Sequence, residues 1–424
     1  MRLEIPDLSL IVLIGPSGCG KSTFAARHFK PTEILSSDRC RAWVSDDEMD
    51  QTATLDAFEI LHHIAARRLA RGRLTVVDAT NVQLRARKPL VELARRYHVP
   101  PVAIVFDLPE AVCLERDRTR TDRSVGEEVV RNHISELRRW LGRLGEEKFR
   151  RIHVFRSPEE VDAAVVERRP LPPDRRFDRG PFDLIGDIHG CGGELEEMLT
   201  RLGYQPDPAG VWRHSEGRRA IFLGDLVDRG PRIPDVLRIV MDMVEAGVAL
   251  CVPGNHDFKL KKALEGRRVQ LRRGLEQSME QLERETPEFR DKVRDFIDGL
   301  TSHYVLDGGR LVAAHGGMRA EMQGRWSGRV LDFALFGETT GEMDEFGLPV
   351  RANWAARYWG SATVVYGHTP VREPEWLNNT INIDTGCVFG GRLTALRWPE
   401  RELVSVPARQ AYAASRRPFL DLPD

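Results

Sequence analysis

Two groups of residues in this chain have types and spacings that suit phosphate chemistry. The first is the segment Gly15–Ser22, which follows an apolar run at residues 8–14 and precedes a helix-forming stretch. Glycines let such a loop curl so that its N–H groups surround a phosphate, while Lys21 reaches the outer phosphates and Ser22 binds Mg²⁺. The pattern predicts a P-loop that binds ATP or another NTP together with Mg²⁺. The residues expected to contact the nucleotide are Gly15, Ser17, Gly18, Gly20, Lys21, Ser22 and Thr23.

Two further positions suit the acceptor side of a phosphoryl transfer. Asp38 and Arg41 follow a short hydrophobic segment, where the second strand of a P-loop fold would end. A carboxylate can accept the proton of the attacking hydroxyl, and a cation can hold the acceptor in line. On the residues alone, a helix cap and a solvated arginine explain the pair equally well. Asp78 ends another apolar run and resembles the carboxylate of a Walker B strand, with capping of the next helix as its alternative.

A row of arginines follows further along the chain. Arg116, Arg120 and Arg123 are spaced 4 and 3 residues apart, and such positions share one face of a helix. Guanidinium groups above a P-loop would neutralise charge on the transferring phosphate, which is the role of the lid in small kinases. The alternative is a basic helix whose charges are solvated.

The second group consists of five short blocks between residues 186 and 369, each after an apolar run. The blocks are Gly186–Gly190, Gly224–Gly230, Gly254–Asp257, Ala314–Gly316 and Gly367–Thr369. They place carboxylates, an asparagine and histidines at the ends of predicted strands. Such oxygen and nitrogen donors suit two divalent metals of the Mn²⁺ or Fe type.

These blocks resemble the binuclear metallophosphoesterase family over roughly residues 182–400. The resemblance implies that a water between the two metals attacks the phosphorus atom. It assigns Asp187 and His189 to one metal, Asp225 to both, and Asn255, His315 and His368 to the other.

The same resemblance implies residues that act on the substrate. Arg229 would bind the phosphate, and His256, oriented by Asp228, would protonate or stabilise the leaving oxygen. Asp384 follows another apolar strand, and the sequence assigns it equally well to this site and to a turn. Serine/threonine protein phosphatases carry Glu where Asp257 stands, which disfavours a protein substrate.

The complete order of motifs resembles the bacterial end-healing polynucleotide kinase-phosphatase family from about residue 8 to about 405. This resemblance implies that the first half phosphorylates 5′-OH ends with NTP and Mg²⁺. Asp38 would be the general base, Arg41 would contact the acceptor strand, and the three arginines would line the donor side. The second half would remove 2′,3′-cyclic, 2′ or 3′ phosphates with Mn²⁺ or Ni²⁺. The substrates would be broken ends of RNA, with DNA as the other candidate.

Longer members of that family carry a ligase-like domain after the phosphatase, and no lysine here is followed by the x-Asp-Gly or x-His-Gly of an adenylated ligase lysine. We therefore expect sealing by a separate RNA ligase. An RNA-end methyltransferase and a second copy of the chain in a homodimer are further expected partners.

The bulk properties suit two enzyme domains. A chain of 424 residues is long enough for two or three domains. In the first half, strand-like runs alternate with helical stretches such as 54–71 and 127–144, and this alternation predicts an α/β fold with a parallel sheet. The second half is expected, from its resemblance, to be a calcineurin-like α/β/β/α sandwich. The predicted parts are a P-loop domain at 1–166, a Pro- and Arg-rich linker at 167–181, a metallophosphoesterase domain at 182–405 and a tail at 406–424.

Net charge and cysteine content indicate what the protein can bind and in which kind of compartment it works. The net charge of −1 gives no overall signal for nucleic acid, so binding would rely on local basic patches. The six cysteines have no paired metal spacing, which disfavours a disulfide framework and favours a reducing compartment. Without a signal-peptide pattern or an apolar run near the ~20 residues that span a bilayer, we expect a cytoplasmic protein with no membrane contact.

Three alternatives remain at this stage. The first is a small-molecule or nucleotide kinase fused to a dinucleoside polyphosphatase, which would keep every motif named above. The second is a protein phosphatase regulated by ATP binding to the P-loop half. The third is a scaffold with inactive sites, which is disfavoured because every catalytic residue type is present.

Overall fold

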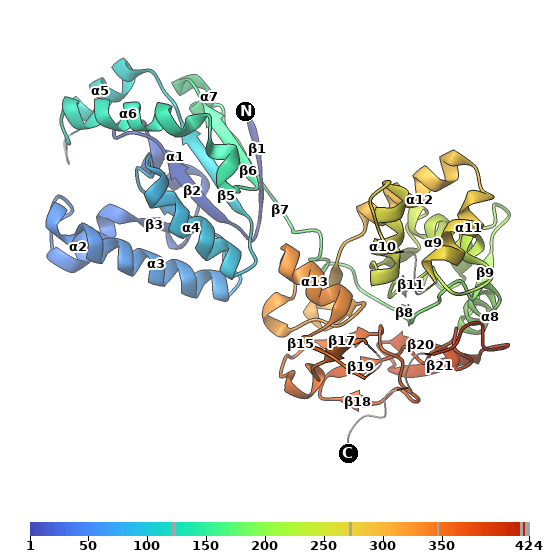
Figure 1. Ribbon diagram of the computed structural model, residues 1–424. Coiled ribbons are helices and arrows are strands. Elements are labelled where there is room, and N and C mark those ends of the chain that lie inside the picture. The colour runs from blue at the N-terminus through green and yellow to red at the C-terminus, as the bar shows by residue number, and fades with distance from the viewer. Residues whose placement is uncertain (121–123, 271–273, 346, 416–418, 420–424) are drawn as a thin grey trace. The chain divides into compact units, whose positions relative to one another are not determined.

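The computed structural model describes residues 1–424 except 121–123, 271–273, 346, 416–418 and 420–424. It divides into two compact units (Figure 1). One comprises Met1–Leu171 with Arg325–Ser327, and the other comprises Pro172–Gly324 with Gly328–Asp424. The division after Leu171 lies inside the segment 167–181 that was expected to be a linker. In the described part of the chain, no helix is long and apolar enough to cross a membrane.

The first unit is built on a five-stranded sheet in the order β3-β4-β2-β5-β6, whose neighbouring strands are all parallel. These strands are β2 (Leu10–Ile14), β3 (Ile34–Ser36), β4 (Thr75–Asp78), β5 (Pro101–Phe106) and β6 (Arg151–Phe155). A separate parallel pair joins β1 (Arg2–Pro6) to β7 (Val165–Arg169). The helices are α1 (Lys21–His28), α2 (Ser37–Ser45), α3 (Thr54–Ala70), α4 (Leu84–Arg96), α5 (Glu110–Arg118), α6 (Glu127–Leu141) and α7 (Pro158–Asp162).

Both faces of this sheet are covered, as its continuous apolar strands require. Along β2, Leu10 and Val12 pack in one hydrophobic cluster with residues of α3 and α4. Ile11 and Leu13 point the other way and pack with residues of α1 and α6. The predicted parallel α/β domain is therefore confirmed, and its loops at the carboxyl ends of the strands carry the P-loop.

The second unit contains two five-stranded sheets, in the orders β12-β11-β8-β20-β21 and β13-β14-β17-β19-β18. The first sheet consists of β8 (Phe182–Ile185), β11 (Arg219–Phe222), β12 (Ala249–Cys251), β20 (Arg392–Trp398) and β21 (Glu402–Pro407). The second consists of β13 (His303–Leu306), β14 (Leu311–Ala314), β17 (Thr363–Tyr366), β18 (Trp376–Leu377) and β19 (Thr380–Asn382). Short antiparallel pairs are β9 (Tyr204–Pro206) with β10 (Trp212–His214) and β15 (Thr339–Met343) with β16 (Pro349–Arg351).

The helices of this unit are α8 (Gly192–Leu202), α9 (Ile233–Glu245), α10 (Asn255–Leu264), α11 (Leu275–Glu283), α12 (Pro287–Gly299) and α13 (Gly328–Phe336). The two sheets share one apolar layer, in which Leu184 and Ile221 of the first sheet pack with Val365 of the second. The outer face of the first sheet packs against α8 and α9. The outer face of the second packs against α13. These layers confirm the expected α/β/β/α sandwich.

Candidate active sites

The glycine-rich loop lies between the end of β2 and the start of α1. Gly18 and Gly20 have φ of 76° and 91°, which residues with a side chain rarely adopt. A Cβ at Gly18 would also lie 2.2 Å from the carbonyl oxygen of Cys113. Lys21 is 8% exposed, and its Nζ donates to two carbonyl oxygens of the loop at 2.9 and 2.7 Å. The loop therefore brings backbone N–H groups, a helix N-terminus and an ammonium together, which suits the phosphates of a nucleotide.

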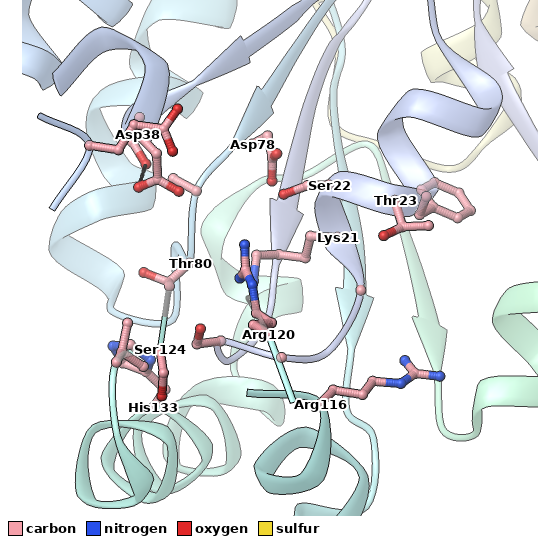
Figure 2. Close-up of a pocket in the computed structure, with 18 of the residues that line it drawn as sticks. Lys21, Ser22, Thr23, Asp38, Asp78, Thr80, Arg116, Arg120, Ser124 and His133 are labelled. Atoms are coloured by element: carbon pink, nitrogen blue, oxygen red, sulfur yellow. Dashed lines mark hydrogen bonds between the residues drawn. The ribbon is translucent and has the colours of Figure 1, made fainter. Parts of the chain in front are cut away.

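A cavity of about 920 Å³ opens beside this loop (Figure 2). The predicted residues that line it are Ser17, Gly18, Gly20, Lys21, Ser22, Thr23, Asp38, Arg41, Arg116 and Arg120. Gly15 is buried behind the loop, and its N–H donates to the carbonyl oxygen of Thr80 at 2.9 Å. Arg123 lies outside the described residues. The donor-side and acceptor-side residues thus face one shared space.

The acceptor pair has neither of the simpler roles considered from the sequence. The side chain of Ser36 caps α2 by accepting from Arg39 N, so Asp38 does not serve as the cap. Arg41 is 7% exposed, and its Nη1 donates to Asp38 Oδ1 at 2.9 Å and to the Glu48 carbonyl oxygen at 2.6 Å. The arginine is therefore buried and held in place, with the carboxylate at the cavity wall.

Asp78 ends β4 and is 6% exposed. Figure 2 shows Ser22 and Asp78 pointing toward each other across the foot of the cavity. The N-cap position of α4 is Gln83, so Asp78 is not needed there. A hydroxyl and a carboxylate are the hard oxygen donors that Mg²⁺ prefers, and the two residues therefore fit an ion held against the phosphates of a nucleotide.

In the second unit, the predicted metal ligands His189, His315 and His368 lie around Asp225, together with His256, which was predicted to act on the leaving oxygen. Donor atoms of His189, Asp225 and His256 lie within 4.8 Å of one another, and so do those of Asp225, His315 and His368. Asp225 belongs to both groups, which is the position that a bridging ligand needs. His315 Nε2 also lies 3.1 Å from Asn255 Oδ1.

Asp187 belongs to neither three-residue group. Both of its carboxylate oxygens accept from the backbone N–H of His368, at 3.3 and 3.2 Å. Burial and the neighbouring carboxylates of Asp384 and Asp225 raise the pKa of Asp187 well above its ordinary value. Its carboxylate therefore lies within electrostatic reach of Asp225, beside the cluster.

Hydrogen bonds fix how the histidine rings of this cluster are oriented. His189 Nδ1 lies 2.7 Å from the Val227 carbonyl oxygen, and His256 Nδ1 lies 2.5 Å from Asp228 Oδ2. The guanidinium of Arg229 lies 2.6 Å from His189 Nε2 and 2.8 Å from His256 Nε2. A guanidinium only donates, so both Nε2 atoms accept and the protons are on Nδ1. The Nε2 lone pairs therefore point at the Arg229 guanidinium, and His189 Nε2 also lies 3.5 Å from Asp225 Oδ2. A metal ion or substrate at these nitrogens would take the place of the guanidinium.

The charges in this cluster fit divalent cations. Burial raises the pKa of Asp225 to about 7. Burial, assisted by the charge of Asp225, raises the pKa of Asp384 to about 7. The pKa of His315 falls to about 3 because the ring is buried, so it stays neutral. Several buried carboxylates that repel one another are stabilised when a cation lies between them, and carboxylate and imidazole donors suit Mn²⁺ and related ions.

Asp384 combines the two roles that the sequence left open. Its Oδ1 accepts from Gly386 N at 3.0 Å, which stabilises the turn after β19. The residue also lines the cavity beside the metal cluster.

Several residues of this site have a left-handed backbone conformation. The φ angles of His189, Asp225, Asp228, Arg229 and His368 are 48°, 47°, 72°, 71° and 78°. Such angles are unfavourable for residues with side chains and are typical of functional sites held by the surrounding structure. Gly224 at φ 85° precedes Asp225, and a Cβ there would lie 2.3 Å from Gly254 N. Close contact between two motif blocks thus helps to position the metal ligands.

Some residues of the two sites were not expected from the sequence. Asp117 is 2% exposed and contacts the P-loop, and His133 lines the same cavity. In the second unit, Ser278 is hydrogen-bonded to Asp228, and Phe336 lines the cavity. The sequence gives a signal for Asp117, because it is an acidic residue between the lid arginines Arg116 and Arg120. No local sequence feature distinguishes Ser278 or Phe336.

Comparison with known proteins assigns a family to each unit. A model described as an AAA domain matches residues 10–144, and a model of the calcineurin-like phosphoesterases matches residues 180–372. An asymmetrical bis(5'-nucleosyl)-tetraphosphatase PrpE of Anoxybacillus flavithermus is 45% identical over 248 residues, which cover 56% of this chain and 99% of that relative. The chain belongs to the calcineurin-like phosphoesterase family. The PrpE of Bacillus subtilis, which has the same description, is 46% identical over 239 residues, covering 55% of this chain and 98% of the relative.

This calcineurin-like phosphoesterase is therefore an enzyme that also carries a P-loop domain of the kinase-like AAA type. The calcineurin-like family and the ligand atoms around Asp225 both indicate that the second unit binds divalent metal ions. The AAA domain and the loop around Lys21 agree on a nucleotide with Mg²⁺ in the first.

Proposed function

We propose that this protein heals broken RNA ends, with 5′-OH phosphorylation in the first unit and removal of 2′,3′-cyclic, 2′ or 3′ phosphate in the second. The cavity that joins the P-loop to the Asp38–Arg41 pair carries this proposal. It provides room for a nucleotide and an attacking alcohol in one space, with a base and a cation on the alcohol side. The choice of a polynucleotide end as the alcohol follows the resemblance of the complete motif order.

In the kinase reaction, Asp38 would accept the proton of the 5′-OH as its oxygen attacks the γ-phosphorus of the NTP. Arg41, which holds Asp38 at 2.9 Å, would fix the acceptor. Lys21, Arg116 and Arg120 would stabilise the charge that develops on the γ-phosphate and on the departing NDP. Mg²⁺ held near Ser22 and Asp78 would neutralise the phosphate oxygens.

In the phosphatase reaction, Arg229 would hold the phosphate between His189 and His256, since its guanidinium lies within 2.8 Å of both rings. The divalent ions would supply an activated water and charge neutralisation. His256 would take up a proton from solvent at Nε2, its imidazolium form being stabilised by Asp228 at Nδ1, and would give that proton to the leaving ribose oxygen as its bond to phosphorus breaks. Products with 5′-phosphate and 3′-OH ends would suit a separate RNA ligase, and we propose such a ligase as the partner enzyme, with an RNA-end methyltransferase and homodimerisation as further expectations.

A second candidate function is favoured by the names of the relatives. Because the chain matches 99% of one asymmetrical bis(5'-nucleosyl)-tetraphosphatase, hydrolysis of dinucleoside tetraphosphates by the second unit is the main rival. In that case the first unit would phosphorylate a small molecule.

One experiment compares the two candidates. The full chain is incubated with ATP, Mg²⁺, Mn²⁺ and an RNA oligonucleotide that bears a 5′-OH and a 2′,3′-cyclic phosphate, and both ends are analysed by mass. We expect the 5′ end to gain a phosphate, except with Lys21→Ala. We expect the 3′ end to lose its phosphate, except with Asp187→Ala. A parallel reaction contains diadenosine tetraphosphate in place of the RNA. Unchanged RNA ends in the first reaction, together with cleavage of diadenosine tetraphosphate in the second, would overturn end healing in favour of the rival.

A further inference from the structure

The cavity of the second unit extends well beyond the metal cluster. Its volume is about 530 Å³, which is typical of pockets that enclose an entire small molecule. The metal-binding residues form one part of the wall. The rest of the wall is mixed: its polar side chains include Glu276, Gln277 and Arg351, and its apolar part includes Phe336, Leu348, Pro349, Phe389, Ala413 and Ala414. The cavity thus has room for the group attached to the phosphate as well as for the phosphate.

Phe336 is the exposed aromatic side chain of this wall. It is the last residue of α13 and is 40% exposed, although it lines the cavity. Its ring lies 6.3 Å from the ring of His368, measured between centroids, and the two planes are nearly perpendicular. An exposed phenyl ring beside a metal-binding histidine provides a flat surface on which a planar ligand can stack.

Phe389 is a second aromatic residue of this wall and contacts Arg229. The guanidinium carbon of Arg229 lies 5.2 Å from the centre of the Phe389 ring, and the same guanidinium contacts His189 and His256. A phosphate held by Arg229 would therefore have an aromatic ring on this side too. The apolar surface is continuous with the residues that bind the phosphate.

The segment 411–415 closes the wall next to Phe389. The N–H groups of Tyr412 and Ala413 donate to the Val388 carbonyl oxygen at 2.9 and 3.0 Å. Tyr412 Oη donates to Glu194 Oε1 at 2.8 Å, and Glu194 is 1% exposed. These bonds hold the segment in a fixed position, so the cavity is shaped before a ligand enters.

We infer that this cavity binds the nucleoside attached to the scissile phosphate and that Phe336 stacks on its base. The phosphatase would then select nucleotides over phosphoesters that lack an aromatic group. Stacking on an aromatic side chain is tolerant of base identity, so all four bases would be accepted. The inference rests on the proposed phosphatase function and names what that site recognises.

The test compares two monoesters of secondary alcohols, 3′-AMP and glycerol 2-phosphate, with the full chain in Mn²⁺. We expect kcat/KM for 3′-AMP to exceed that for glycerol 2-phosphate about tenfold or more. Phe336→Ala should reduce this ratio to about one or two, whereas Phe336→Tyr, which keeps the aromatic face, should retain it. Trp359→Ala is the matched control, because Trp359 is 86% exposed and does not line the cavity.

Each result has one meaning. A wild-type ratio near one, or a ratio that Phe336→Ala leaves unchanged, would overturn the nucleoside site while the phosphatase stands. Hydrolysis of neither ester by the wild-type protein would overturn the proposed phosphatase itself, and the nucleoside site with it.

Discussion

Ser17 of the P-loop donates a hydrogen bond to Asp117 of α5, with 3.0 Å between Ser17 Oγ and Asp117 Oδ1. The other carboxylate oxygen of Asp117 accepts from Ser124 Oγ at 2.8 Å and from Val125 N and Gly126 N at 3.2 Å each. Asp117 thus connects the phosphate-binding loop to the segment that follows the lid arginines. Its contacts hold α5, which also carries Arg116, against the P-loop.

The variant Asp117→Asn should weaken the kinase selectively. An amide NH₂ would face one or more of the four donors that now point at the carboxylate, and an unsatisfied buried group costs about 1–3 kcal/mol. We expect kcat/KM for ATP to fall about tenfold or more, with phosphatase activity retained. Asp56→Asn, at an exposed position of α3, is the matched control. Full kinase activity in Asp117→Asn would show that the lid is positioned by other contacts.

The variant Arg41→Lys should affect the acceptor more than the donor. Arg41 holds both Asp38 and the Glu48 carbonyl oxygen, which the single ammonium of lysine cannot reproduce with the same geometry. We expect KM for the 5′-OH substrate to rise at least about tenfold, while KM for ATP changes little. Arg39→Lys on the exposed side of the same helix serves as control. An equal rise in both KM values would place Arg41 on the donor side instead.

The sequence predicted the local features of both units well. The helical stretches expected at 54–71 and 127–144 correspond to α3 and α6, because their apolar positions repeat with the helical period. The P-loop was equally visible, since glycines with positive φ, a lysine and a hydroxyl are needed within a few residues. Motifs whose residues are close in sequence can be recognised without knowledge of the fold.

Contacts between distant segments could not be predicted in this way. Ser278 reaches Asp228 across 50 residues, and Tyr412 reaches Glu194 across 218 residues. Both depend on the order in which strands assemble into two sheets. The sequence likewise indicates only a tail at 406–424, whereas in the structure residues 412–415 line the phosphatase cavity.

Removal of metal should make the second unit less stable as the pH rises. Burial raises the pKa of Asp225 and Asp384 to about 7 from an ordinary 3.8. Between about pH 4 and 7 the unfolded chain releases protons that the folded, metal-free protein retains, so folding stability falls as the pH rises through this range. Divalent ions bind the ionised carboxylates and therefore stabilise the protein more at higher pH.

Thermal unfolding of the full chain tests this relationship. With EDTA, these carboxylates should make Tm fall as the pH is raised from 5 to 8. Asp384→Asn should make the fall in Tm smaller, because an amide does not titrate. The increase in Tm on addition of Mn²⁺ should be larger at pH 8 than at pH 6. Lys21→Ala, which changes the other unit, should retain the Mn²⁺ effect. A Mn²⁺ effect that is larger at pH 6 would contradict the assignment of Asp225 as a metal ligand.

The pair His256 and Asp228 should matter most for substrates whose leaving oxygen needs a proton. Asp228 is buried, accepts from Ser278 Oγ and lies 2.5 Å from His256 Nδ1, which leaves Nε2 directed toward Arg229. In Asp228→Asn the ring would lose the carboxylate charge that stabilises its protonated form, even where the amide oxygen still accepts from Nδ1. We expect hydrolysis of 3′-AMP to fall about 10²–10⁴-fold, the usual contribution of a general acid.

Hydrolysis of p-nitrophenyl phosphate should fall much less in the same variant, because its leaving oxygen is stable without a proton. His256→Ala should show the same dependence on the leaving group, and the double variant should add little, because the two residues act as one unit. Asp291→Asn on the exposed side of α12 is the control for loss of a carboxylate. If both substrates lose activity equally in Asp228→Asn, then Asp228 and His256 instead hold the metal or the phosphate, as the closeness of His256 to His189 and Asp225 would also permit.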